Sequence, residues 1–263
     1  MSDKINEFRK LFTDYIHQLQ NTSNILHNDK QEEYANIRKF KIETVVNADI
    51  FYIDNYAEMI VPEYIDNLYN FGVIAASNNK PIFSGRWVIP IKDQYNLVMG
   101  LVGWSDTSDV KYLFSNTKYF RRGDDIYGLE SLKYIFERNR MIVVEGIADV
   151  LRLRDIGFKE AVATNGTMYS WWKSFIFNSV DNVIFIPDRD QAGLGTNKIW
   201  KSKKAIRLII PITDGRVRFK DIDEYVRGNN ENEAYINEYI NKCFEYLSEK
   251  VVSGVVEEVS MIS

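Results

Sequence analysis

The sequence predicts an α/β fold in which a mostly parallel sheet in the second half of the chain is joined to a mixed α/β lobe in the first half, with helices near both ends. Residues 141–144 and 183–186 are unbroken apolar runs, which is typical of strands buried on both faces of a parallel sheet. Segments of helical length separate these and other short apolar runs. This alternation indicates βαβ units with right-handed crossovers.

The first part of the chain predicts a terminal helix followed by the mixed lobe. Apolar residues recur from Phe8 to Leu19 at the spacing of one helix face, so we expect a helix that packs on the core. The polar segment 21–30 predicts a loop, and residues 1–33 are therefore the expected N-terminal helix and loop. The lobe extends over residues 34–139, with one helix starting at Pro62 because proline favours the first helical turn.

The second half of the chain, residues 140–228, carries the elements of the parallel sheet. An Asn165-Gly166 pair marks a turn after the second strand. The expected strands are residues 141–144, 161–163, 183–187 and 206–211, and the expected helices are 148–156, the aromatic-rich segment around 169–175, and about 192–203.

Residues 229–263 form the expected C-terminal helix and tail. A polar stretch precedes a helix whose apolar and aromatic residues, from Tyr235 to Leu247, share one side. Cys243 lies on that side and is expected to be a buried core thiol. The tail from Val251 is expected to be loosely held.

Acidic residues follow both long apolar runs. Glu145 comes after the first run, and Asp188 and Asp190 come after the second. Ligands of open α/β sheets bind beyond the carboxyl ends of the strands, and alternate residues of an extended segment point to the same side, so we expect these three carboxylates in one crevice. Oxygen ligands without histidine or thiolate favour Mg²⁺ or Mn²⁺ over zinc. The alternative is that Glu145 and Asp149 only stabilise a helix N-terminus and that the two later aspartates are solvated turn residues.

Composition excludes several classes of protein. A chain of 263 residues with 45% hydrophobic content can bury a core without a disulfide or metal staple. One cysteine and two histidines cannot supply a zinc site, and both histidines lie outside the α/β region, which argues against a Ser-His-Asp hydrolase. No apolar run has the length of a membrane span and the start of the chain lacks a signal-peptide core, so a cytoplasmic location without membrane contact is expected.

The charge balance predicts weak rather than strong binding to nucleic acid. The formal net charge is -4, whereas strong nucleic-acid binders are usually basic. Basic residues nevertheless gather in the segment 198–220 and in the upstream segment 86–122. A run of charged residues is often only the solvated face of a helix. Together, however, these two basic segments favour transient, salt-sensitive template binding.

The blocks that carry these residues resemble the Toprim domain and, within that superfamily, the bacterial DnaG-type primases. The Toprim pattern is a Glu-Gly after one strand, here Glu145-Gly146, and an Asp-x-Asp after a later strand, here Asp188 to Asp190. The resemblance extends over roughly residues 34–228 and implies a Rossmann-like Toprim lobe joined to a primase-specific N-terminal lobe. The further blocks that resemble primases are residues 144–150, 161–167 and 220–227 and, upstream, 85–93, 100–103, 111–113 and 120–129.

The resemblance implies a DNA primase that synthesises short RNA primers on single-stranded DNA from ribonucleoside triphosphates, in a phage- or bacterium-type replisome. It implies Glu145, Asp188 and Asp190 as catalytic ligands of two Mg²⁺ or Mn²⁺ ions, with further acidic residues completing the rim. Those further residues are Asp149, Asp221 and Asp223. Triphosphate or template phosphate would be held by three basic residues, in which arginine offers bidentate contacts and lysine a point charge. These are Arg86, Lys111 and Arg122.

The chain departs from the family at several positions. Arg189 stands between the two aspartates, where the family usually has glycine. Trp104 stands where an arginine often follows the segment 100–103, and Phe114 stands where the family has an asparagine after the segment 111–113. The ligands of the family's zinc ribbon are missing as well. Template recognition and helicase docking are therefore expected either to come from another polypeptide or to be dispensed with, and the partners expected are a replicative helicase or a separate zinc-binding subunit. Two alternatives stay open: a Toprim nuclease that uses the same acids for water attack, and a non-catalytic, primase-derived replisome module.

Overall fold

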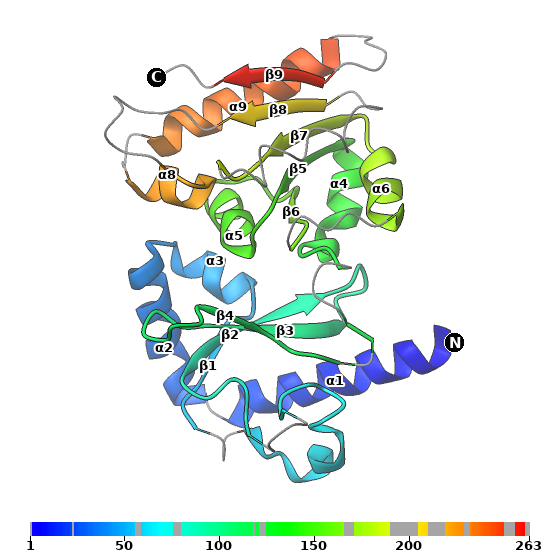
Figure 1. Cartoon of the computed structure of the whole chain (residues 1–263), viewed down its shortest axis with the longest axis vertical. Coiled ribbons are helices and arrows are strands. Elements are labelled where there is room, and N and C mark those ends of the chain that lie inside the picture. The colour runs from blue at the N-terminus through cyan, green and yellow to red at the C-terminus, as the bar shows by residue number, and fades with distance from the viewer. Residues whose placement is uncertain are drawn as a thin grey trace. The chain divides into compact units, whose positions relative to one another are not determined.

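The computed structural model describes residues 2–22, 24–55, 59–75, 80–117, 119–120, 125–165, 171–189, 205–209, 219–228, 232–249 and 256–260. The chain divides into two units, Met1–Arg122 and Gly123–Ser263. Each contains its own sheet (Figure 1). The finer division into four segments, expected from the sequence, stays a prediction.

The first unit is built on an antiparallel sheet in the order β1-β2-β3-β4. Its two long central strands, β2 (Arg86–Lys92) and β3 (Val98–Trp104), are buried along almost their whole length. The shorter strands are β1 (Phe51–Ile53) and β4 (Tyr112–Phe114). The accompanying helices are α1 (Ser2–Thr22), α2 (Asn24–Arg38), α3 (Ile42–Asn47) and the 3-10 helix η2 (Pro62–Asn67).

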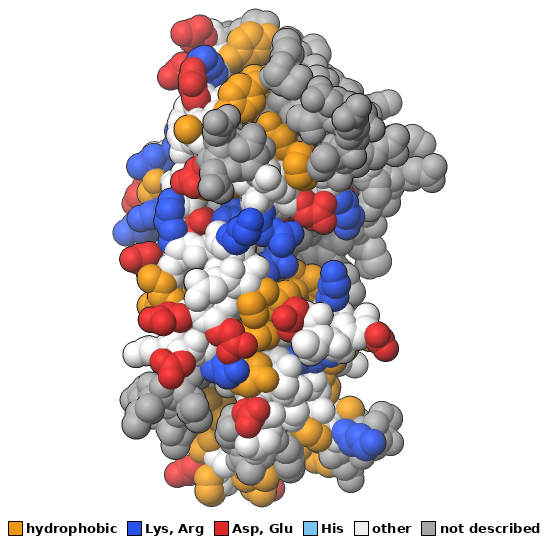
Figure 2. Space-filling view, turned by 90° about the vertical axis from the view of Figure 1, so that its left-hand side faces the viewer, with side chains coloured by type: hydrophobic (Ala, Val, Ile, Leu, Met, Phe, Trp, Pro, Cys, Tyr) orange, Lys and Arg blue, Asp and Glu red, His pale blue; other side chains and the backbone are white. Residues whose placement is uncertain are grey.

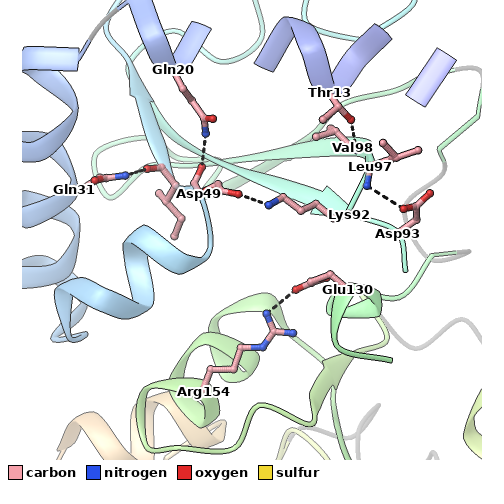
Figure 3. A network of polar contacts seen from close by, with 11 residues as sticks. Thr13, Gln20, Gln31, Asp49, Lys92, Asp93, Leu97, Val98, Glu130 and Arg154 are labelled. Carbon is pink, nitrogen blue, oxygen red and sulfur yellow. Dashed lines mark hydrogen bonds and ion pairs between the residues drawn. The ribbon is translucent and has the colours of Figure 1, made fainter. Parts of the chain in front are cut away.

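The predicted terminal helix is confirmed as α1, which packs against β3. Its buried face includes Phe12, whose ring stacks on Phe71 with a centroid separation of 4.5 Å. The Thr13 hydroxyl oxygen accepts the Val98 backbone N–H at 2.8 Å, which fixes the helix to the first residue of β3 (Figure 3). Proline at the first position of η2 is likewise where the sequence places a helix start, although the helix is of the 3-10 type.

The loop predicted for residues 21–30 is wrong, because α1 runs to Thr22 and α2 begins at Asn24. The polar composition of this segment hid its tertiary contacts. The Lys30 carbonyl accepts the indole N–H of Trp87 at 2.9 Å, and the Lys30 ammonium lies 4.6 Å from the centre of the Tyr52 ring. Packing of α2 against β1 therefore supports a helix that the apolar pattern alone does not predict.

Two glycines of the first unit offer a matched test of backbone packing. Gly72 and Gly85 both have a positive φ, +67° and +68°, but an added Cβ at Gly72 would lie 2.7 Å from the Asn116 backbone nitrogen, whereas at Gly85 it would meet nothing within 4 Å. We expect Gly72→Ala to lower the free energy of unfolding by about 2–4 kcal/mol and Gly85→Ala by only about 1 kcal/mol, the cost of the left-handed conformation. Urea denaturation of both variants measures the difference. Equal losses would contradict the predicted overlap at Gly72.

The second unit contains a five-stranded sheet in which every neighbouring pair is parallel, in the order β6-β5-β7-β8-β9. The mostly parallel sheet predicted from the apolar runs is thus confirmed. Its strands are β5 (Arg140–Val144), β6 (Ala161–Ala163), β7 (Asn182–Ile186), β8 (Ala205–Ile209) and β9 (Val256–Ser260). The helices are η3 (Leu129–Ser131), α4 (Leu132–Arg138), α5 (Ile147–Asp155), α6 (Trp171–Asn178), α8 (Ile222–Gly228) and α9 (Asn232–Glu249).

Helices lie on both sides of this sheet, with α4 and α6 on one side and α5 and α8 on the other (Figure 1). The C-terminal helix α9 packs on β7 and β8 and buries Cys243, as predicted, and this burial raises the pKa of the thiol to about 11. The expectation of a loosely held tail is wrong for residues 256–260, which form the edge strand β9 beside β8. The helix predicted for about 192–203 lies outside the described residues.

No helix in the part of the chain that the structure describes is both long enough and apolar enough to cross a bilayer.

Candidate functional site

Glu145 and Asp188 meet at the carboxyl edge of the parallel sheet. Strands β5 and β7 are neighbours in a register that pairs Val144 with Ile186, so the residues after both strands emerge side by side. The Glu145 Oε1 atom accepts the backbone N–H of Asp188 at 3.2 Å. This bond orients the glutamate toward the second acidic segment. Asp190, the third acid expected here, lies outside the described residues.

Asp149 joins this edge from the first turn of α5, where the side chain is almost completely buried. Its Oδ1 atom accepts the backbone N–H of Asp223 at 3.1 Å. Burial, followed by repulsion from the charges of Asp221, Asp188 and Asp223, raises the pKa of Asp149 well above its ordinary value. Burial and the neighbouring carboxylates thus both oppose the ionisation of Asp149.

The carboxylate of Asp149 also explains why residue 146 is a glycine. A Cβ at this position would lie 2.7 Å from Asp149 Oδ2, so the side chain of Asp149 folds back over the backbone at the start of α5. The Glu-Gly pair of the sequence motif therefore combines an outward-reaching carboxylate with the space that a second carboxylate needs. Asp149 also has the position required by the alternative prediction, in which it stabilises a helix N-terminus, because it lies in the first turn of α5.

Asp221 is placed by a helix cap. Its Oδ1 atom accepts the backbone N–H of Glu224 at 2.8 Å, and the Glu224 carboxylate accepts the backbone N–H of Lys220 at 2.9 Å, so the start of α8 is closed reciprocally. Burial raises the pKa of Asp221 to about 6, against the Glu224 hydrogen bond, and the neighbouring Glu224, Asp223 and Asp188 charges add to the rise.

Asp223 has a different environment from the other acids. Its carboxylate pairs with the Nε atoms of Arg152 at 3.1 Å and of Arg227 at 3.5 Å. Arg152 also pairs with Asp155 at 3.2 Å, and all three of Arg152, Asp155 and Asp223 are buried. These ion pairs favour a structural role for Asp223 over the metal ligation expected from the sequence. Asp188 is paired too, with the half-exposed Lys220 at 3.0 Å.

The donor set suits a hard divalent cation. Among the residues that the structure describes, no group of three or more acidic, histidine or cysteine side chains has the arrangement of a complete metal site. The acids that gather here offer oxygen ligands only, and burial, together with repulsion from neighbouring acids, raises the pKa values of Asp149 and Asp221. A divalent cation relieves this kind of repulsion, and oxygen ligands favour Mg²⁺ or Mn²⁺.

The predicted basic residues belong to the first unit. Arg86 is buried, and its guanidinium donates to the Val110 carbonyl at 2.9 Å and to the Ser108 hydroxyl at 2.8 Å. It therefore holds the loop that leads to Lys111, which is exposed. Arg122 lies outside the described residues.

Two residues that the sequence did not assign to the candidate site meet the chain at the end of β6. Lys173 of α6 is fully buried, and its ammonium donates to the Thr164 carbonyl at 2.7 Å. Asn165, the next residue, has a φ of 55° and is 5% exposed. The predicted Asn-Gly turn was the signal for the conformation of Asn165, but nothing in the sequence indicates that a lysine of an aromatic-rich helix is buried beside it.

A family model described as Toprim domain matches residues 139–207, the segment that holds β5, β6, β7 and the acidic edge. Residues 139–207 are therefore similar to the Toprim domain. Among curated proteins, the chain is similar to the DNA primase of Rickettsia prowazekii, 32% identical over 170 residues, and to that of Salmonella typhimurium, 37% identical over 143 residues. These alignments cover 60% and 52% of this chain but only 27% and 24% of the primases. The chain thus spans about a quarter of the length of these relatives.

Solved primase structures show the same fold over both units. The zinc-binding and RNA polymerase domains of the Aquifex aeolicus primase match with a TM-score of 0.74 and 21% identity, covering 92% of this chain and 61% of that one. A DnaG primase catalytic domain solved with single-stranded DNA matches with a TM-score of 0.67 and 23% identity, covering 91% and 83%. The chain therefore has the fold of the DnaG-type primase core, and the resemblance found in the sequence is confirmed.

Proposed function

We propose that this chain is the catalytic core of a DNA primase, a DNA-directed RNA polymerase that makes short RNA primers on single-stranded DNA from ribonucleoside triphosphates. The observation that carries the proposal is the meeting of Glu145 and Asp188 at the ends of neighbouring parallel strands within a primase-core fold. The names of the sequence relatives and the single-stranded DNA in one matching structure support the reaction and the template.

Glu145, Asp188 and Asp190 would hold two Mg²⁺ or Mn²⁺ ions, with Asp149 and Asp221 as rim carboxylates. When bound, such ions lower the pKa of the attacking 3′-hydroxyl and neutralise charge on the α-phosphate and the pyrophosphate leaving group. The protein orients Glu145 through the Asp188 N–H and keeps Asp149 folded over Gly146. Neither zinc nor a histidine ligand enters this proposed core.

Lys111 and Arg122 would contact triphosphate or template phosphate, and Arg86 would support them by holding the loop before Lys111. On the face drawn in Figure 2, lysine and arginine side chains gather in places and acidic side chains lie between them. Such a mixed surface favours weak, salt-sensitive template binding, which suits an enzyme that releases short products. A replicative helicase or a zinc-binding subunit would then strengthen template engagement.

Primer synthesis tests the proposal directly. The protein is incubated with single-stranded DNA, the four ribonucleoside triphosphates and Mg²⁺ or Mn²⁺, with and without a replicative helicase. We expect short products that depend on template and metal and are destroyed by ribonuclease. Metal-dependent cleavage of the DNA without nucleotides would instead support the nuclease alternative. Absence of synthesis together with absence of Mn²⁺ and nucleotide binding would support the non-catalytic module.

Metal binding is expected to change thermal stability in a pH-dependent way. The pKa of Asp221 is raised from 3.8 to about 6, so its contribution to folding stability is present below its unfolded pKa and is lost as the pH rises through about 6. Mn²⁺ relieves the repulsion of the ionised acids. We therefore expect Mn²⁺ to raise the melting temperature more at about pH 7.5 than at about pH 5. Differential scanning fluorimetry measures this, with Asp181→Asn as a control away from the acidic edge. An equal Mn²⁺ effect at both pH values would contradict the prediction.

A further inference from the structure

The end of β6 places Asn165 at the same edge of the sheet as Glu145. Strand β6 is the parallel neighbour of β5, and the Thr164 backbone N–H donates to the Val144 carbonyl at 3.0 Å. Glu145 follows Val144, and Asn165 follows Thr164. The two side chains therefore emerge from adjacent chain segments just past the carboxyl ends of their strands.

Asn165 is held rigidly in this position. The ammonium of the buried Lys173 fixes the Thr164 carbonyl, and on the outer side of β6 the backbones of Tyr127 and Ala163 exchange two hydrogen bonds of 2.9 Å. The Asn165 Nδ2 atom donates to the Asp125 carbonyl at 3.5 Å, which assigns the orientation of the amide. The left-handed backbone conformation at Asn165 is one that asparagine adopts more readily than most residues.

The other end of this amide lacks a partner. Asn165 is 5% exposed, and its Oδ1 atom is buried without a hydrogen bond to any residue in the described part of the chain. A buried acceptor without a partner costs free energy, and where it lies beside a candidate site a ligand that supplies the partner would recover that cost. The missing partner is a hydrogen-bond donor or a cation, because an amide oxygen offers only lone pairs. Phosphate and carboxylate oxygens are thereby excluded.

We propose that Asn165 Oδ1 accepts a hydrogen bond from the 2′-hydroxyl of a nucleotide bound at the acidic edge, and so favours ribonucleotides over 2′-deoxyribonucleotides. This inference rests on the proposed primase reaction, in which the 3′-hydroxyl of the preceding nucleotide attacks and the phosphates of the incoming nucleotide face the metal ligands. The ribose of the incoming nucleotide then presents its 2′- and 3′-hydroxyls as donors, whatever its base, and a 2′-deoxyribonucleotide lacks only the 2′-hydroxyl. This hydroxyl is also the group that distinguishes RNA from DNA.

A second asparagine in the same sheet provides a matched control. Asn182 also donates through Nδ2, to the Asn139 carbonyl at 3.1 Å, and its Oδ1 atom also lacks a partner among the described residues. Asn182 is the first residue of β7, whereas the acids follow the last residue of that strand. The two asparagines thus share their chemistry but lie at opposite ends of the parallel sheet.

The test compares Asn165→Gly with Asn182→Gly. Glycine removes the amide and tolerates the left-handed backbone at residue 165. Equilibrium binding of ATP and 2′-deoxy-ATP, with Mn²⁺ present, is measured for the full chain and for both variants, and incorporation of the two nucleotides is measured on one template. We expect the wild-type preference for ATP to fall by about tenfold or more in Asn165→Gly and to stay unchanged in Asn182→Gly.

Binding and incorporation separate this inference from the proposed function. Equal affinity of the wild type for ATP and 2′-deoxy-ATP, or an unchanged ratio in Asn165→Gly, would overturn the role of Asn165 even if primers are made. Loss of Mn²⁺ affinity in Asn165→Gly with an unchanged nucleotide ratio would also overturn it, by making the amide oxygen a metal ligand. Failure of primer synthesis with a selective, Asn165-dependent binding of ATP would overturn only the proposed reaction.

Discussion

Glu145→Gln is expected to reduce primer synthesis by at least about a hundredfold while changing the free energy of unfolding by less than about 1 kcal/mol. Glutamine keeps the length of the side chain, and its amide oxygen can still accept the Asp188 N–H that Glu145 accepts at 3.2 Å. The substitution removes the negative charge that would bind the metal ions. Single-turnover primer synthesis and urea denaturation measure the two quantities on the same preparation.

The separation of activity from stability is the informative part of this result. The substitution is not expected to weaken the fold, because glutamine has nearly the same shape and can accept the same backbone N–H. The control is Asp181→Asn, an exposed acid before β7 that accepts a hydrogen bond from Asn139 at 2.8 Å. Glu145→Gln with more than about half of the wild-type activity would remove Glu145 from the proposed metal site.

The parallel sheet could be predicted from the sequence because its strands are buried on both faces. Strands β5 and β7 appear as continuous apolar runs, and an acid follows each, so their adjacency was enough to predict that Glu145 and Asp188 meet. The strand β9 could not be predicted in this way. It is an edge strand whose sequence contains Glu257 and Glu258, and it depends on pairing with β8.

The buried ion pairs of the second unit could not be predicted from the sequence. Asp223 resembles the other acids of the motif in sequence, yet its partner Arg152 lies 71 positions earlier on α5. A helix pattern predicts which residues face inward, but it does not predict that an inward arginine meets two carboxylates. Asn165 and Lys173 show the same limit, because their roles depend on the neighbouring strand end rather than on local pattern.

Arg152→Met is expected to lower the free energy of unfolding by about 3–5 kcal/mol, because it leaves buried carboxylates without their partner. Arg152 is 3% exposed, and it pairs with Asp155 at 3.2 Å and with Asp223 at 3.1 Å. Asp223 retains Arg227 at 3.5 Å, but the buried Asp155, the last residue of α5, would lose its ion pair with Arg152. Urea denaturation with a two-state fit measures the loss.

A second substitution distinguishes stranded charge from lost packing. Adding Asp155→Asn to Arg152→Met removes the buried charge that lost its ion pair with Arg152, and it is expected to recover part of the stability, since the penalty for breaking a buried pair comes largely from the remaining charge. Lys242→Met, which breaks an exposed pair with Glu238 on α9, is the control and is expected to change stability far less. If Arg152→Met were as mild as Lys242→Met, the buried ion pairs would not be what fixes α8 to α5, and Asp223 would again be available as a metal ligand.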